Sequence, residues 1–115
     1  MKEHTIDAKE QKLGRLATKV ATLLMGKDTP SFRKNTFPSA KVHIINAGKI
    51  SITNRKLVEM THSHYSGYPG GLKQKTGKIV RTQKGTGALI RHAVSRMLPK
   101  TKHRSNMLKH LTVSE

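Results

Sequence analysis

The second half of the chain is strongly basic and carries no counter-charge of its own. Residues 60–114 include eleven Lys or Arg and no Asp or Glu, while five of the six acidic residues lie at or before Glu59. Such a segment cannot neutralise itself through internal ion pairs, so its cations need phosphates, counterions or another protein. Because the net charge of +17 would repel itself in a compact fold, the sequence predicts a neighbouring polyanion, with nucleic acid the first candidate.

An anionic membrane surface is the other candidate, and the composition argues against it. Basic helices that bind membranes need large apolar anchors, but the chain has no Trp and only two Phe. No stretch approaches the ~20 apolar residues of a membrane span, and residues 1–4 resemble neither a signal peptide nor a transit peptide. The absence of Cys excludes disulfides and thiolate chemistry and agrees with a reducing compartment. We expect a cytoplasmic protein.

Apolar periodicity in the first half predicts an α/β fold, and the length suits one domain over residues 1–115. Thr5 to Asp7 predicts a short opening strand. Helical spacing of apolar residues predicts a helix from Leu13 to Leu24, with Gly26 as its C-cap. The β-branched run Val42 to Ile45 is typical of a buried strand, and Ile50 to Thr53 alternates in the same way. This order indicates a right-handed crossover between two parallel strands.

The middle of the chain has a weaker apolar signal. Leu57 to Tyr65 leaves room for a more exposed strand. Ser66 to Gly71 then interrupts regular structure, since Pro69 suits the first corner of a turn and Gly70 can take the positive φ of a type II turn. Lys73 to Gly87 has almost no apolar residues, so we expect a loop.

Two helices are predicted near the end of the chain. Ala88 to Leu98 has apolar residues at helical spacing, and Pro99 ends that helix. A basic connector leads to a last short helix, with Ser105 as a possible N-cap.

Candidate catalytic and metal sites are scarce. No two carboxylates share a motif of the kind that acid-base catalysis uses. His62 and His64 could project from one strand face toward a metal, but no third ligand or supporting carboxylate lies nearby. The glycine-rich turn matches neither the dinucleotide fingerprint nor the Walker pattern. The sequence predicts no enzyme, no cofactor and no metal.

Two features have a structural interpretation beside the functional one. The turn from Ser66 to Gly71 is either a simple turn or a place where backbone approaches a sugar-phosphate chain that Lys73 and Lys75 neutralise. Arg91 and Arg96 lie opposite the apolar stripe of their helix, either solvated or in contact with RNA, and the charge of the chain favours contact. Aromatic residues make up only 3% of the chain, which argues against a base-stacking platform and for phosphate neutralisation and recognition of RNA shape.

Several motifs, in order along nearly the whole chain, resemble the bacterial-type large-subunit ribosomal protein family thirteen. They are Asp7-Ala8, Leu13-Gly14-Arg15-Leu16-Ala17, Ile45-Asn46-Ala47, the block HYSGYPGGLK from His64 to Lys73, Met97-Leu98-Pro99-Lys100 and Met107-Leu108-Lys109. The central block and the Met-Leu-Pro-Lys block, when they occur in one chain, are highly specific for this family.

The resemblance implies a three-layer α/β/α single domain with a four-stranded, mostly parallel sheet, embedded in large-subunit rRNA and added early in assembly. It also implies contacts with neighbouring ribosomal proteins. The alternative is a regulatory protein that binds mRNA outside the ribosome, and an RNA-processing enzyme is a third, poorer hypothesis. Charge and resemblance together predict these rRNA contacts: His64, Tyr65, Ser66, Gly67, Tyr68, Pro69, Gly70, Gly71, Lys73, Lys75, Arg91, Arg96, Lys100, Lys102, Arg104 and Lys109.

Overall fold

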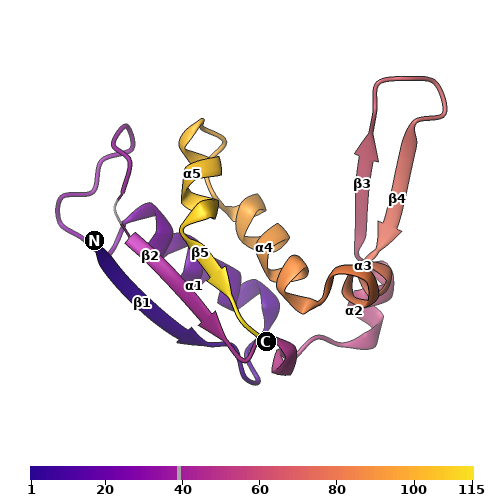
Figure 1. Cartoon of the computed structure of the whole chain (residues 1–115), viewed down its shortest axis with the longest axis horizontal. Coiled ribbons are helices and arrows are strands. Elements are labelled where there is room, and N and C mark those ends of the chain that lie inside the picture. Colours follow the sequence, from indigo (N-terminus) through magenta and orange to yellow (C-terminus); the bar gives the residue numbers. More distant parts are fainter. Residues whose placement is uncertain (39) are drawn as a thin grey trace.

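The strands of the protein form two separate sheets (Figure 1). A computed structural model describes residues 1–38 and 40–115. The elements run in the order β1 (Lys2–Asp7), α1 (Leu13–Met25), β2 (Ala40–Ile45), the 3-10 turn η1 (Ala47–Lys49), α2 (Asn54–Glu59), β3 (Thr61–Tyr65), β4 (Leu72–Thr76), α3 (Gly77–Lys84), α4 (Thr86–Met97), α5 (His103–Lys109) and β5 (Leu111–Val113). Within these described ranges, no helix is long and apolar enough to cross a membrane.

The larger sheet is parallel, with strand order β1-β2-β5. Alternation along β2 buries Val42 and Ile44 and exposes Lys41 and His43, as expected for a strand with one covered face. Helices α1 and α4 pack on that covered face (Figure 1), where Leu16 and Val94 belong to the same core cluster as Ile44. The parallel pair β1-β2 joined through α1 confirms the predicted crossover between parallel strands, and Gly26 caps α1 with φ 76° as predicted.

The predicted three-layer, four-stranded sheet is wrong in its details. Within the described part of the chain, the parallel sheet has three strands, and Lys41 and His43 on its second face are exposed. Strands β3 and β4 pair with each other, antiparallel, and project from the body (Figure 1). Their sequences, THSHY and LKQKT, are too polar to extend a buried sheet. The third strand, β5, has only three residues, too few for a periodicity to be recognised.

The predicted loop from Lys73 to Gly87 is also wrong, because it contains β4 and α3. The Thr76 hydroxyl accepts a hydrogen bond from the Ile79 N–H at 3.4 Å and caps α3, which is the usual role of threonine at this position. Gly85, with φ 85°, separates α3 from α4. The only large apolar side chain that α3 buries is Val80, so its sequence has too few apolar residues to predict a helix from an apolar stripe.

Three further boundaries differ from the predictions. Leu57 lies in α2, so the predicted strand from Leu57 to Tyr65 begins only at Thr61. Instead of a strand at Ile50 to Thr53, a single bridge joins Ser51 to Lys12. The last helix begins at His103, and the Ser105 hydroxyl donates to the Lys102 carbonyl at 3.3 Å instead of capping the helix.

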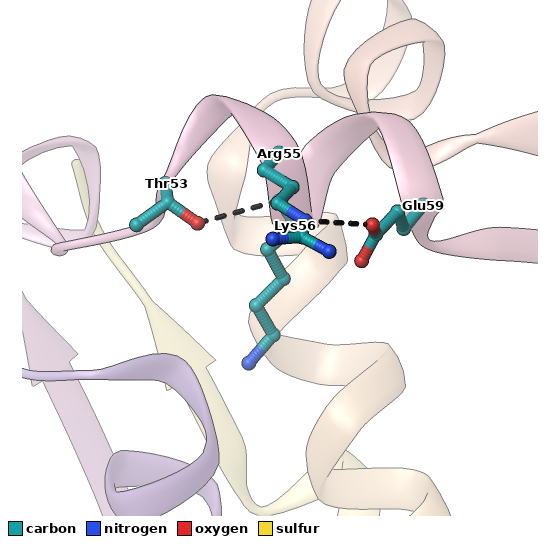
Figure 2. Close-up of polar contacts among 4 residues, drawn as sticks. All are labelled: Thr53, Arg55, Lys56 and Glu59. Atoms are coloured by element: carbon teal, nitrogen blue, oxygen red, sulfur yellow. Dashed lines mark hydrogen bonds and ion pairs between the residues drawn. The ribbon is translucent and has the colours of Figure 1, made fainter.

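Helix α2 is short and depends on local polar contacts. The Thr53 hydroxyl accepts from the Lys56 N–H at 3.3 Å, and Arg55 Nε donates to Glu59 Oε1 at 2.9 Å (Figure 2). The Lys56 side chain points away from that ion pair in the same view. Leu57 is the buried residue of α2, and it packs in a small second cluster with Val80 of α3 and Leu89 of α4. This cluster anchors the foot of the β3-β4 hairpin.

Two of the sequence motifs meet where β1 and β2 end. Asp7 Oδ1 accepts from the Lys9 N–H at 2.9 Å and from Asn46 Nδ2 at 3.1 Å. Asn46 has φ 56°, a left-handed conformation that asparagine tolerates better than most residues. The Lys9 N–H, and after it the Asn46 amide, hold the pKa of the Asp7 carboxyl below its usual value of 3.8. The carboxylate therefore ties the two strand ends together in its charged form.

We predict that Asp7→Asn unfolds at lower urea concentration than the wild type at pH 7. Because the pKa of Asp7 is lower in the folded protein than in the unfolded chain, the stabilisation is present above the unfolded value of 3.8 and is lost as pH falls through the folded value. The difference between the two proteins should therefore shrink in acid. Glu3→Gln is the control, since Glu3 makes only a 3.9 Å pair with Lys41. Equal urea midpoints for Asp7→Asn and wild type at pH 7 would contradict the role of Asp7.

Candidate nucleic-acid interface

The β3-β4 hairpin has two chemically different faces. Its antiparallel register pairs His62 with Lys75, His64 with Lys73 and Tyr65 with Leu72. Since side chains alternate along a strand, the two His-Lys pairs share one face and the Tyr-Leu pair lies on the other. The predicted common face of His62 and His64 is confirmed, because both line the same cleft.

This cleft, named here the basic cleft, has a volume of about 420 Å³. The hairpin forms one wall, and helices α3 and α4 form the other. Lys75 Nζ donates to Gln83 Oε1 at 3.1 Å and so links the two walls. The remaining polar side chains that line the cleft are His62, Ser63, His64, Lys73, Lys84 and His92. Such a lining, rich in cations and without a carboxylate, suits phosphate oxygens.

A pair of stacked imidazole rings lies in the lining of the basic cleft. The rings of His62 and His92 stack with centroids 4.0 Å apart and an interplanar angle of 22°. Burial, followed by the nearby His62 and Arg96, lowers the pKa of His92 from its usual value of 6.5. His92 is therefore neutral at neutral pH, and its protonation in acid opposes the stack. Within the described ranges, no group of three or more potential ligands is arranged to hold a metal ion.

The turn at the tip of the hairpin is tightly specified. The Gly71 N–H donates to the Tyr68 carbonyl at 2.9 Å, and Gly70 has φ 76°, as predicted for a type II turn with Pro69 at its first corner. A Cβ atom on Gly71 would collide with the Ser66 hydroxyl. Every residue from Ser63 to Gly70 is nevertheless exposed to solvent. The backbone of the tip is thus held by the turn, while its side chains are exposed to solvent.

The other predicted contacts lie apart from the basic cleft. Arg96 is exposed near the end of α4, and Lys100, Lys102, Arg104 and Lys109 follow on the connector and on α5. We call these four residues the connector cations. None of them lines the basic cleft. Apart from Arg91, the predicted residues therefore form two groups, one along the hairpin and one from Arg96, near the end of α4, to Lys109 on α5.

Arg91 is used within the protein itself. Its guanidinium donates to the carbonyl of Leu108 at 3.4 Å and to the carbonyl of Leu111 at 3.3 Å. These bonds join α4 to the end of α5 and to β5, where carbonyl groups lack helical partners. The sequence predicts solvation or RNA contact for Arg91, and neither anticipates these bonds within the chain.

Sequence reasoning missed the cations of α3. Lys78, Arg81 and Lys84 lie on this helix, and Lys84 lines the basic cleft. Their spacing of three residues is compatible with one side of a helix. That spacing, between the capping Thr76 and Gly85, is the signal that could have found them.

The described part of the chain contains two ion pairs of Lys or Arg, Lys41-Glu3 and Arg55-Glu59, and both cations precede residue 60. His4 Nε2 also lies 3.6 Å from Asp28 Oδ2. The prediction that residues 60–114 do not neutralise their charge through ion pairs within the chain is therefore confirmed. Apart from Arg91 and Lys75, which make hydrogen bonds within the protein, these cations are available to an external anion.

A model of the family "Ribosomal protein L13" matches residues 1–115. The chain belongs to this family. It is similar to the large ribosomal subunit protein uL13 of Mycoplasmopsis synoviae, with 44% identity over 94% of this chain and 74% of the relative. It is also similar to the proteins of the same name from Solibacter usitatus, with 40% identity over 96% of this chain and 76% of the relative, and from Pseudothermotoga lettingae, with 44% identity over 94% and 73%. The resemblance to ribosomal protein family thirteen is confirmed.

In this member of the L13 family, we predict that Arg91→Gln lowers the free energy of unfolding by about 1 kcal/mol, because two carbonyl groups lose a charged donor. Arg96→Gln is the matched control on the same helix, since Arg96 is exposed and is not a partner in the described bonds that Arg91 makes. Urea unfolding of both variants checks the difference. Equal stabilities would show that the Arg91 bonds contribute nothing.

Proposed function

We propose that this chain is a structural component of the large ribosomal subunit that binds rRNA and supports subunit assembly and translation. The observation that carries this proposal is the eleven cations of residues 60–114 without an ion-pair partner in the described chain. Membership of the ribosomal protein L13 family supports it and supports a structural rather than a catalytic role. Charge repulsion of this size is relieved when phosphates lie beside the cations.

Two surfaces would hold the rRNA. The basic cleft and the hairpin supply His64, Lys73, Lys75 and the backbone from Ser66 to Gly71, to which the structure adds Lys84. Arg96 and the connector cations supply the second surface. Because the two surfaces lie at different places along α4, one domain could hold two RNA segments together.

The same proposal places the chain, as one domain over residues 1–115, in the cytoplasmic large subunit beside neighbouring ribosomal proteins. Regulatory binding to an mRNA stays a prediction that no feature of the structure favours over rRNA. Binding to rRNA through phosphate contacts weakens steeply as the salt concentration rises, because each contact releases counterions.

We predict a steep salt dependence of binding to protein-free large-subunit rRNA. If about 8 phosphates are contacted, the slope of log affinity against log salt should be about −6 to −7. Lys84→Gln should make the slope shallower by about 1, because one phosphate contact is lost. Arg55→Gln is the control, since Arg55 already pairs with Glu59 at 2.9 Å. Filter binding across a salt series measures both values, and a slope near zero would overturn the proposed function.

We also predict that the double substitution Lys100→Glu and Lys102→Glu impairs assembly of the large subunit. Charge reversal on the exposed connector places carboxylates against phosphates without removing buried apolar groups. Sucrose-gradient profiles of a strain carrying only this variant should show fewer complete large subunits. Lys41→Glu, on the open face of the parallel sheet, is the control. Normal profiles for the double variant would contradict a role for the connector in assembly.

A further inference from the structure

The tip of the β3-β4 hairpin carries an exposed apolar patch on the face away from the basic cleft. Tyr65 and Leu72 form the last cross-strand pair before the turn, and their exposed fractions are 61% and 57%. Tyr68, in the turn itself, is 76% exposed. None of the three lines the basic cleft. We call Tyr65, Tyr68 and Leu72 the tip patch.

The composition of the tip patch is unusual for this chain. The chain has two Tyr and no Trp, and both tyrosines lie at the tip. An isolated two-stranded hairpin is only marginally stable in water, and here the helices α2 and α3 lie at its foot and not at its tip (Figure 1). The apolar side chains therefore do not serve the core of the protein.

The backbone fixes where Tyr68 leaves the chain. The bond from the Gly71 N–H to the Tyr68 carbonyl and the positive φ of Gly67 and Gly70 define the turn. A rigid turn lowers the entropy lost when Tyr68 is fixed against a partner, and tyrosine itself has only two side-chain torsions to fix.

The charge around the tip patch selects the kind of partner. Lys73 and Lys75 follow Leu72 on β4, and residues 60–114 contain no carboxylate. A partner must therefore combine flat apolar surfaces with negative charge. Unpaired nucleotides do so, because each has a π-face for an aromatic ring and a phosphate for a lysine.

We propose that the tip patch stacks against unpaired bases of RNA, while the opposite face of the hairpin holds phosphates in the basic cleft. This inference rests on the proposed function and adds a base-contacting face to it. It also revises the expectation of phosphate contacts alone, since a low total of aromatic residues is compatible with a local platform when all the tyrosines gather at one place.

Intrinsic fluorescence gives a direct test on the full chain. Because Tyr65 and Tyr68 are its only tyrosines and it lacks Trp, its emission reports on the tip alone. Adding protein-free large-subunit rRNA should quench this emission, whereas a fully paired RNA duplex should quench it much less. Equal quenching by both RNAs, or none by either while binding is seen by filter assay, would overturn the inference.

Substitutions separate the tip patch from the basic cleft. Tyr65→Ala and Tyr68→Ala should each weaken rRNA binding by about 5- to 100-fold with an unchanged salt slope, because stacking does not release counterions. Tyr68→Phe should retain binding, and Val58→Ala, at another exposed apolar residue on α2, is the control.

The outcomes distinguish the two proposals. If the alanine variants bind rRNA like the wild type but lose a neighbouring ribosomal protein in reconstituted subunits, the tip patch is a protein contact and the inference is wrong while the proposed function stands. If the wild type shows no salt-dependent binding to rRNA, the proposed function and this inference both fail.

Discussion

The structure depends on one apolar layer, formed where α1 and α4 pack on the covered face of the β1-β2-β5 sheet. Leu16, Val20 and Leu24 of α1 are essentially inaccessible to solvent, as are Val42 and Ile44 of β2 and Ile90 and Val94 of α4. Burial of each such side chain contributes roughly 1.5 to 3 kcal/mol. This layer must hold the fold together against the repulsion of a net charge of +17.

The distribution of charge follows from that constraint. Cations cannot enter the apolar layer without partners, and the few carboxylates are used locally, as Asp7 is at the strand ends and Glu59 is on α2. The unpaired cations therefore occupy the hairpin, the outer sides of the later helices and the connector. Separation of a small neutral core from a charged periphery lets the protein fold and still present its cations to a polyanion.

The sequence motifs that mark the L13 family have different physical roles. Asp7-Ala8 and Ile45-Asn46-Ala47 close the ends of the parallel sheet, where Ala8 and Ala47 are fully buried and the Ala8 N–H donates to the Ile45 carbonyl at 3.0 Å. The block from His64 to Lys73 builds an exposed hairpin tip. The first two motifs thus maintain the fold, while the third has the geometry of a contact surface.

The amino-acid sequence alone determined the elements whose apolar residues recur at a clear period: α1 with its Gly26 cap, β2, and α4, which ends at Met97 shortly before Pro99. Pro69 and Gly70 likewise determined the turn between β3 and β4. The sequence also determined the basic character of residues 60–114, because charge is a property of composition. Only the tertiary structure decided that β3 and β4 leave the sheet, that α3 forms where few apolar residues occur, and that Arg91 bonds to the Leu108 and Leu111 carbonyls. The physical reason is that these features depend on partners distant in sequence. Val80 is buried only because Leu57 and Leu89 meet it, and the basic cleft exists only because residues of the hairpin, α3 and α4 come together.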